Sequence, residues 1–72
     1  MKYTAEQVRN GKTISLNDTV VVNDTKSFTI VGIEVQVSPV NSEVSCYFTL
    51  DYTCNGRNGT DKIESRHLSK WL

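Results

Sequence analysis

The longest β-type pattern in this chain is SFTIVGIEVQVS, residues 27–38. Its apolar residues change phase at Gly32, because they occupy even positions before the glycine and odd positions after it. They are Phe28 and Ile30 in the first group and Ile33, Val35 and Val37 in the second. A regular strand points alternate side chains to opposite faces, so it cannot place both groups on one face. We therefore predict a β-bulge or sharp bend at Gly32, which re-phases the strand and curves the sheet.

Shorter β-type patterns flank this stretch, and turn residues such as Asn17-Asp18 separate them. We expect further strands at 13–16, 19–23, 44–54 and 60–66. Residues 44–54 alternate cleanly between apolar and polar side chains, as in a strand with one buried face. The side chains that we expect in the core are Cys46, Phe48, Leu50, Tyr52 and Cys54.

The connection between the last two strands allows two registers. A four-residue loop would pair Asn55 with Thr60, whereas a two-residue Asn58-Gly59 turn would pair Arg57 with Thr60. Both registers turn Ile63 toward the core, so the inward face is the same in either case.

Helical signals occur at both ends of the chain. Thr4 and Gln7 form a capping-box pattern that predicts a short helix at 4–10, ending before Gly11. Residues 67–71 are typical of one helical turn, whose Leu68 and Trp71 can close an open end of the sheet. We expect Trp71 to be structural rather than an anchor for a partner.

Short strands at this spacing, in a chain of 72 residues, are typical of a small all-β sandwich or barrel. We predict a single domain over residues 1–72, formed by a five-stranded SH3-like barrel with a short N-terminal helix and a C-terminal helical turn. An OB-like barrel is the alternative topology.

Charge and composition restrict the function. The chain carries 8 Lys and Arg against 8 Asp and Glu, evenly divided between its halves, which disfavours electrostatic capture of nucleic acid or membrane. No apolar run approaches the roughly 18 residues of a membrane span, and no secretory signal opens the chain. We expect a cytoplasmic protein with no membrane partner. Its small core also favours a homodimer.

Catalytic and metal-binding patterns are weak. Cys46, Cys54 and the single histidine, His67, show no ligand spacing and no motif of a nucleophile. Cys46 and Cys54 fall on one strand, about 26 Å apart at the rise of a strand, which is too far for a disulfide. We expect no enzyme activity, no cofactor and no metal.

Binding to another protein is the function that we expect, in a small accessory or inhibitor protein of bacteria or their phages. Outward-facing Tyr47 and Thr49 offer an uncharged surface, and aromatic residues are common in interfaces. The candidate partner-binding residues are Tyr47, Thr49, Arg57, Lys62, Arg66 and Lys70. The alternative is a small nucleic-acid-binding barrel that uses the stretch Arg57–Lys70, because basic and aromatic residues together bind single strands.

Overall fold

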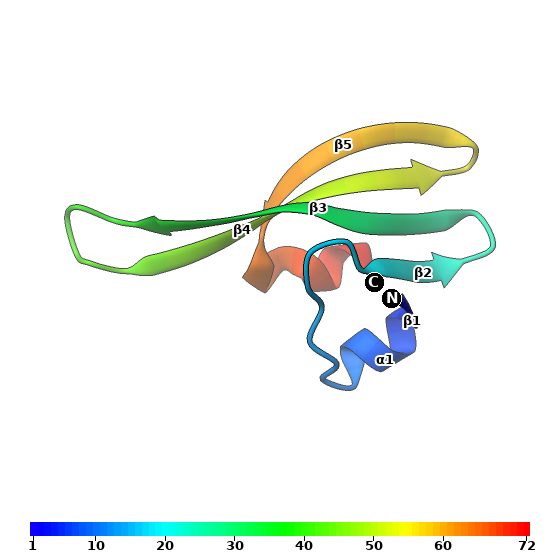
Figure 1. Ribbon diagram of the computed structural model, residues 1–72, viewed down its shortest axis with the longest axis horizontal. Helices are drawn as coiled ribbons and strands as arrows, with labels where there is room; N and C mark the ends of the chain where they lie inside the picture. The colour runs from blue at the N-terminus through cyan, green and yellow to red at the C-terminus, as the bar shows by residue number, and fades with distance from the viewer.

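The computed structural model describes all 72 residues and shows a five-stranded sheet with one helix near each end of the chain (Figure 1). The elements are β1 (Lys2–Thr4), α1 (Ala5–Arg9), β2 (Thr19–Asn23), β3 (Lys26–Val37), β4 (Val44–Cys54), β5 (Arg57–Glu64) and the 3₁₀ helix η1 (Ser65–Trp71). The strands lie in the order β1-β2-β3-β4-β5. β1 is parallel to β2, and the other neighbours are antiparallel.

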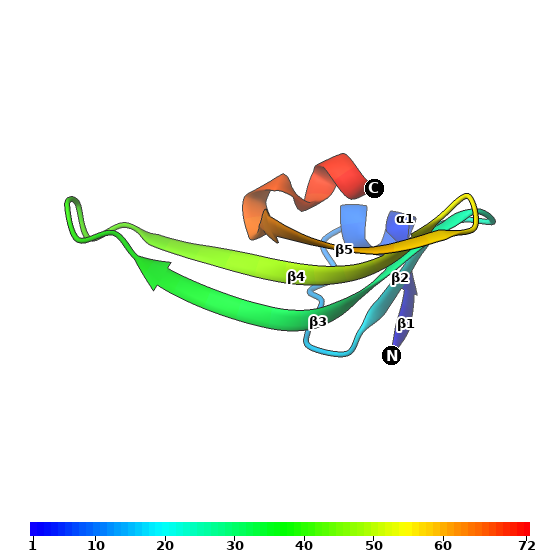
Figure 2. The same ribbon diagram turned by 90° about the horizontal axis from the view of Figure 1, so that it is seen from above.

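The mainly β class is confirmed, but the barrel is not. The sheet is open, because β1 and β5 form its two edges and do not pair with each other. Two helices occupy the side where closure would occur: the side chains of Val8 in α1 and of Leu68 and Trp71 in η1 pack against the core. Figure 2 shows η1 lying along one face of the sheet. Helix packing therefore buries the core face that a closed barrel would enclose with strands.

The bulge predicted at Gly32 is confirmed. The pairing of β3 with β4 shifts between Ile30 and Gly32, so Val31 is the extra residue. A Cβ atom on Gly32 would lie only 3.2 Å from the Cβ of Thr49 on the paired strand, which explains why the residue after the bulge is glycine. The bulge brings Ile33 onto the same face as Ile30, opposite Phe48.

The capping box predicted for the N-terminal helix is present. The Gln7 N–H donates to the Thr4 hydroxyl at 3.2 Å, and the Thr4 N–H donates to the Gln7 amide oxygen at 2.8 Å. The helix itself spans Ala5–Arg9, one residue shorter at each end than predicted. At the other end of the chain, η1 begins two residues before the predicted helical turn and ends where predicted.

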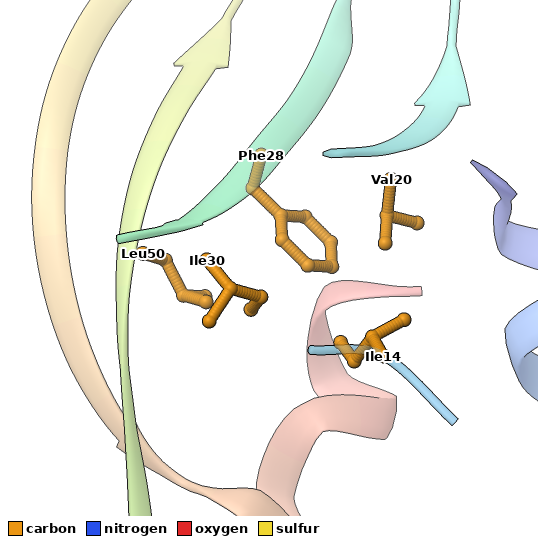
Figure 3. Close-up of a cluster of buried hydrophobic side chains, with 5 residues drawn as sticks. All are labelled: Ile14, Val20, Phe28, Ile30 and Leu50. Atoms are coloured by element: carbon orange, nitrogen blue, oxygen red, sulfur yellow. The ribbon is translucent and has the colours of Figure 1, made fainter. Parts of the chain in front are cut away.

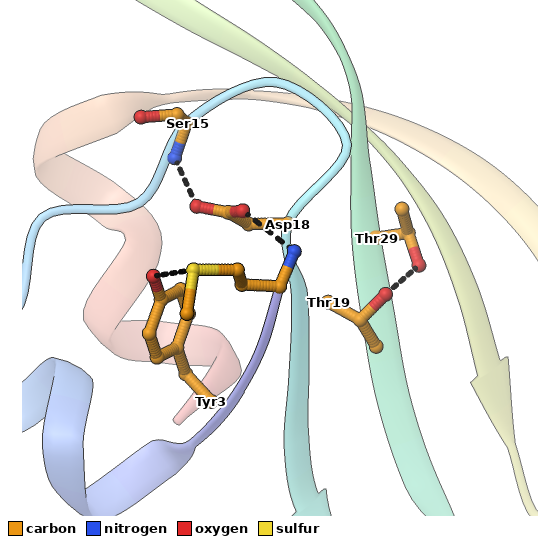
Figure 4. Close-up of polar contacts among 6 residues, drawn as sticks. Tyr3, Ser15, Asp18, Thr19 and Thr29 are labelled. Carbon is orange, nitrogen blue, oxygen red and sulfur yellow. Dashed lines mark hydrogen bonds and ion pairs between the residues drawn. The ribbon is translucent and has the colours of Figure 1, made fainter.

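The strand predicted at 13–16 is wrong, because this segment is irregular. Asp18 organises it as a turn: its carboxylate accepts the Ser15 N–H at 2.8 Å and the N-terminal ammonium group at 3.1 Å (Figure 4). Asn17 adopts a φ of 70° and donates its N–H to the Ile30 carbonyl at 2.7 Å. The strand that sequence analysis missed is β1, whose three residues pair with β2.

Both predicted registers of the β4–β5 hairpin are also wrong. The turn is Asn55-Gly56, with φ of 53° and 79°, and it pairs Cys54 with Arg57. Two positive φ angles are what a type I′ turn requires. β5 therefore starts at Arg57 instead of residue 60, although Ile63 still faces inward, opposite Phe48.

The core lies where β2, β3 and β4 are covered by the two helices. Its buried side chains are Ile14, Val20, Phe28, Ile30 and Leu50 (Figure 3). Tyr52 and Ile63 pack against this cluster from β4 and β5. No helix is both long and apolar enough to cross a membrane.

Candidate interaction surface on the projecting arm

The β3–β4 hairpin extends far beyond its neighbours and gives the molecule its longest dimension, 42 Å (Figures 1 and 2). β2 pairs with β3 only as far as Thr29, and β5 pairs with β4 only as far as Tyr47. We call residues 31–46 the arm. It contains the outer part of β3, the connecting loop and the first residues of β4, and it projects as a two-stranded ribbon.

One face of the arm is entirely apolar. The paired residues on it are Val35 with Cys46 and Val37 with Val44, and at its base Ile33 pairs with Phe48, which lies just beyond the arm and packs against the core. We call these side chains the apolar face. Four of them are widely exposed: Ile33 at 46%, Val35 at 63%, Val37 at 61% and Val44 at 67%. Soluble monomers rarely leave so continuous an apolar surface without a function for it.

The exposure of this face corrects a prediction. Sequence periodicity assigns Ile33, Val35, Val37 and Cys46 to the face of the sheet that forms the core, and the structure places them on that face. However, α1 and η1 are short, and both lie away from the projecting end of the β3–β4 hairpin (Figure 1). The arm thus continues the core face of the sheet without the layer that covers it elsewhere.

The opposite face of the arm is polar. Glu34 forms an ion pair with Lys62 at 2.5 Å and accepts a hydrogen bond from the Gln36 amide at 3.1 Å. The hydrogen bond from Lys62, followed by the one from Gln36, holds the pKa of Glu34 below its ordinary value of 4.5. The Lys62 ammonium also lies 5.3 Å from the centre of the Tyr47 ring. The arm is therefore amphipathic, with charged and polar contacts on one side only.

The loop at the end of the arm is closed by its own hydrogen bonds. The Ser38 N–H donates to the Glu43 carbonyl at 2.8 Å, and the Ser42 N–H donates to the Ser38 carbonyl at 3.0 Å. The Asn41 side chain accepts the Glu43 N–H at 3.1 Å. Val40 stands at this tip and is 91% exposed. The tip thus exposes one more aliphatic side chain, on a turn that is held by its own hydrogen bonds.

Three of the predicted binding residues, Tyr47, Thr49 and Lys62, come together on the polar face of the sheet. Thr49 pairs directly with Lys62, and Tyr47 pairs with Glu64. The structure therefore places the Tyr47 ring and the Lys62 ammonium side by side. The cation is already paired with Glu34, as described above.

The other predicted residues lie elsewhere. Arg66 is paired with Glu64 at 2.6 Å. Arg57 is at the hairpin turn, where β5 begins, and Lys70 is exposed on η1, which covers the opposite face of the sheet. The stretch Arg57–Lys70 therefore does not form one basic surface.

Sequence reasoning missed the apolar face as a candidate surface. The signal that could have found it is the number of apolar strand residues. The periodicity assigns long stretches of both β3 and β4 to the core face, while the chain offers only two short helices to cover them. When a sheet has more apolar residues on its core face than its helices can cover, the uncovered residues point to a binding partner.

The two cysteines of the chain both lie on β4. Cys46 and Cys54 are both free and lie at opposite ends of β4. Cys46 contributes to the apolar face, whereas Cys54 adjoins the hairpin turn. No three His, Cys, Asp or Glu side chains gather where they could hold a metal ion.

Comparison with protein-family models, with curated proteins and with solved structures found no match for this chain. Its function is therefore inferred from its own geometry. The feature that most needs a functional explanation is the exposed apolar face of the arm.

Proposed function

We propose that this protein is a non-enzymatic binding module that docks onto another protein through the apolar face of its arm. The observation that carries the proposal is the exposure of Ile33, Val35, Val37 and Val44, between 46% and 67%, on one face of a hydrogen-bonded hairpin. The core of a specific interface is apolar and depleted in charge, and this face has both properties.

The strength of such docking follows from the area that a partner would cover. Burying an aliphatic side chain completely is worth about 1.5–3 kcal/mol, so covering these four half-exposed side chains gives about 4–7 kcal/mol. Association costs about 4–15 kcal/mol in lost motion. The apolar face therefore supplies the centre of an interface, and contacts at its rim, including Val40 at the tip, add the remainder.

The shape of the arm suggests the role. A two-stranded ribbon whose backbone is already ordered loses little conformational freedom on binding, so it can enter a groove of a partner at low entropic cost. A ribbon that fills a groove also excludes whatever else binds there. An accessory or inhibitory role in the cytoplasm, as expected from the sequence, is the form of this proposal that we favour.

The test is capture with variants of matched chemistry. Val35→Asp places a charge in the centre of the apolar face, whereas Leu16→Asp makes the same change at a residue that is 51% exposed and lies outside the arm. We expect proteins captured by the wild type to be captured by Leu16→Asp and lost with Val35→Asp. Equal urea midpoints for the three proteins would show that each is folded. Retention of the same partners by Val35→Asp would refute the proposal.

Nucleic-acid binding is less well supported, because two cations of the stretch Arg57–Lys70 are paired with carboxylates. Lys62 contacts Glu34, and Arg66 contacts Glu64. Binding to phosphates depends on cations that are free to replace counterions. We expect no binding of labelled single- or double-stranded oligonucleotides near 50 mM salt, where such contacts are strong. Tight binding there would favour the nucleic-acid function instead.

A further inference from the structure

The arm has a second unpartnered feature, which is the outer edge of β3. β2 and the loop before it occupy this edge only as far as Ile30, which bonds to Asn17 and Asp18. Beyond Ile30 no strand lies beside β3 on that side (Figure 1). Residues 31–37 therefore present an open edge.

The pairing with β4 determines which backbone groups face this edge. The Ser38 N–H donates toward β4, to the Glu43 carbonyl. Along an antiparallel pair, every second residue directs its backbone N–H and C=O groups toward the partner strand. The backbone groups of Glu34 and Gln36 therefore also face β4. The N–H and C=O groups of Ile33, Val35 and Val37 consequently point outward. These residues thus combine free backbone groups with exposed apolar side chains.

Beyond the bulge at Val31, this edge carries few of the devices that usually prevent strands from pairing. Natural edges carry lysines, prolines or inward charges. Between residues 31 and 37 the single charged side chain is Glu34, which Lys62 already neutralises. Pro39 lies beyond the end of β3. The edge is open to an added strand from Ile33 to Val37.

The other edges of the sheet are less suitable. The free part of β4 runs only from Val44 to Cys46, and the charged Glu43, Glu64 and Arg66 line the hollow beside it. β5 carries charged side chains along its length, and β1 has only three residues. An added strand is therefore best accommodated by β3.

We infer that the occupant is a second copy of this chain, whose β3 pairs antiparallel with this β3 about a two-fold axis at Val35. Val35 then opposes Val35 of the second copy, and Ile33 opposes Val37 on either side. Each opposed pair exchanges two backbone hydrogen bonds, so the edge gains about six. The same surface serves both partners, as a two-fold dimer requires.

Charge selects this register among its neighbours. Here Glu34 lies opposite Gln36 of the second copy, which is a carboxylate facing an amide. A shift that opposes Ile33 with Val35 would place Glu34 opposite Glu34, and like charges directly opposite are destabilising. A shift toward the loop brings Pro39, which has no N–H, into the pairing. A shift toward the base meets the bonds that Asn17 and Asp18 make with Ile30.

The dimer does not depend on the proposed function, but it would widen the surface that the function uses. Opposed residues of an antiparallel pair point to the same face. The two apolar faces would therefore adjoin and form one four-stranded surface, with the two cores at opposite ends. A docking protein would meet twice the aliphatic area that one arm provides.

The test is the monomer–dimer equilibrium measured by analytical ultracentrifugation over a range of concentrations. Gln36→Glu creates two Glu–Glu oppositions and should weaken the dimer about fivefold, whereas Gln36→Lys creates two Lys–Glu oppositions and should tighten it by a similar factor. Ser69→Glu and Ser69→Lys, at an exposed position on η1, are the matched controls and should leave the equilibrium unchanged.

A second variant tests the backbone pairing directly. Val35→Pro removes an N–H that faces the open edge and not β4, so it should leave the arm folded and abolish the dimer. A wild-type protein that stays monomeric at millimolar concentration would refute the inference. So would a dimer that ignores the charge at residue 36, because that result would indicate packing through the apolar face. Gln36 lies outside the apolar face, so failure here would leave the Val35→Asp test of the proposed function interpretable.

Discussion

Trp71 is the residue on which the docking of η1 depends most. Its ring lies 5.9 Å from that of Phe28 in an edge-to-face arrangement and 5.1 Å from that of Tyr52. The Lys26 ammonium lies 5.1 Å from the centre of the Trp71 ring. η1 has no side-chain N-cap bond, so these aromatic contacts, together with the hydrogen bond from the Arg9 guanidinium to the Leu72 carbonyl at 2.8 Å, hold it on the sheet.

Trp71→Ala should therefore lower the free energy of unfolding by about 3 kcal/mol, the lower end of the range for Trp→Ala, because the ring is partly exposed. A chain of 72 residues has about 4–11 kcal/mol in total. The substitution removes the only tryptophan and with it the fluorescence signal. Urea unfolding is therefore followed by far-UV circular dichroism. The midpoint should fall by about 2–3 M.

Two variants make this measurement specific. Trp71→Phe keeps an aromatic ring in the same place and should recover about half of the loss. Lys70→Ala, an exposed neighbour in η1, should change the free energy of unfolding by less than about 0.5 kcal/mol. If Trp71→Ala stays within about 1 kcal/mol of the wild type, η1 is not an integral layer of the core and the reasoning fails.

Three further predictions concern the core and the turns. Hydrogen bonding from Ser15, followed by the N-terminal ammonium group, lowers the pKa of Asp18 from 3.8, so the stability that this carboxylate provides is complete above about pH 4 and is lost as the pH falls through its lowered pKa. Asp18→Asn should flatten the acid side of a thermal-unfolding profile, and an unchanged profile would contradict this. Gly59→Ala should cost about 1–3 kcal/mol in urea unfolding, because a Cβ there would lie 2.5 Å from the Tyr52 hydroxyl oxygen; a neutral result would mean that the ring moves freely. Leu50→Ala, at a side chain with 0% exposure, should cost about 2–5 kcal/mol, several times the cost of Val35→Ala by the same assay.

Alternation along a strand is a local property, and it predicted β3, β4 and the bulge at Gly32. Burial is not local, because it depends on which element lies above each residue. The same periodicity that correctly places Ile30 and Leu50 in the core also assigns Val35 to it, although nothing covers Val35. The strands were therefore predicted correctly, but the exposure of one face of the arm was not.

The β4–β5 hairpin shows a second limit. Asn55-Gly56 and Asn58-Gly59 are both good hairpin turns by local preference. The choice depends on a tertiary contact, because in the observed register the Tyr52 ring lies over Gly59, where any larger residue would collide. The position of the basic residues follows from this register, which explains why Arg57 ends up remote from Arg66.

The separation of the arm from the helix-covered core has a consequence for how this chain can change over evolutionary time. Substitutions at Val35, Val37 or Val44 would change the surface that we propose for docking, yet these residues are not among the five buried side chains of the core cluster. Most proteins have a small reserve of stability, and mutations that improve binding often consume it. In this molecule the proposed docking surface can change almost residue by residue at little cost to folding, so related chains could acquire different partners on the same scaffold.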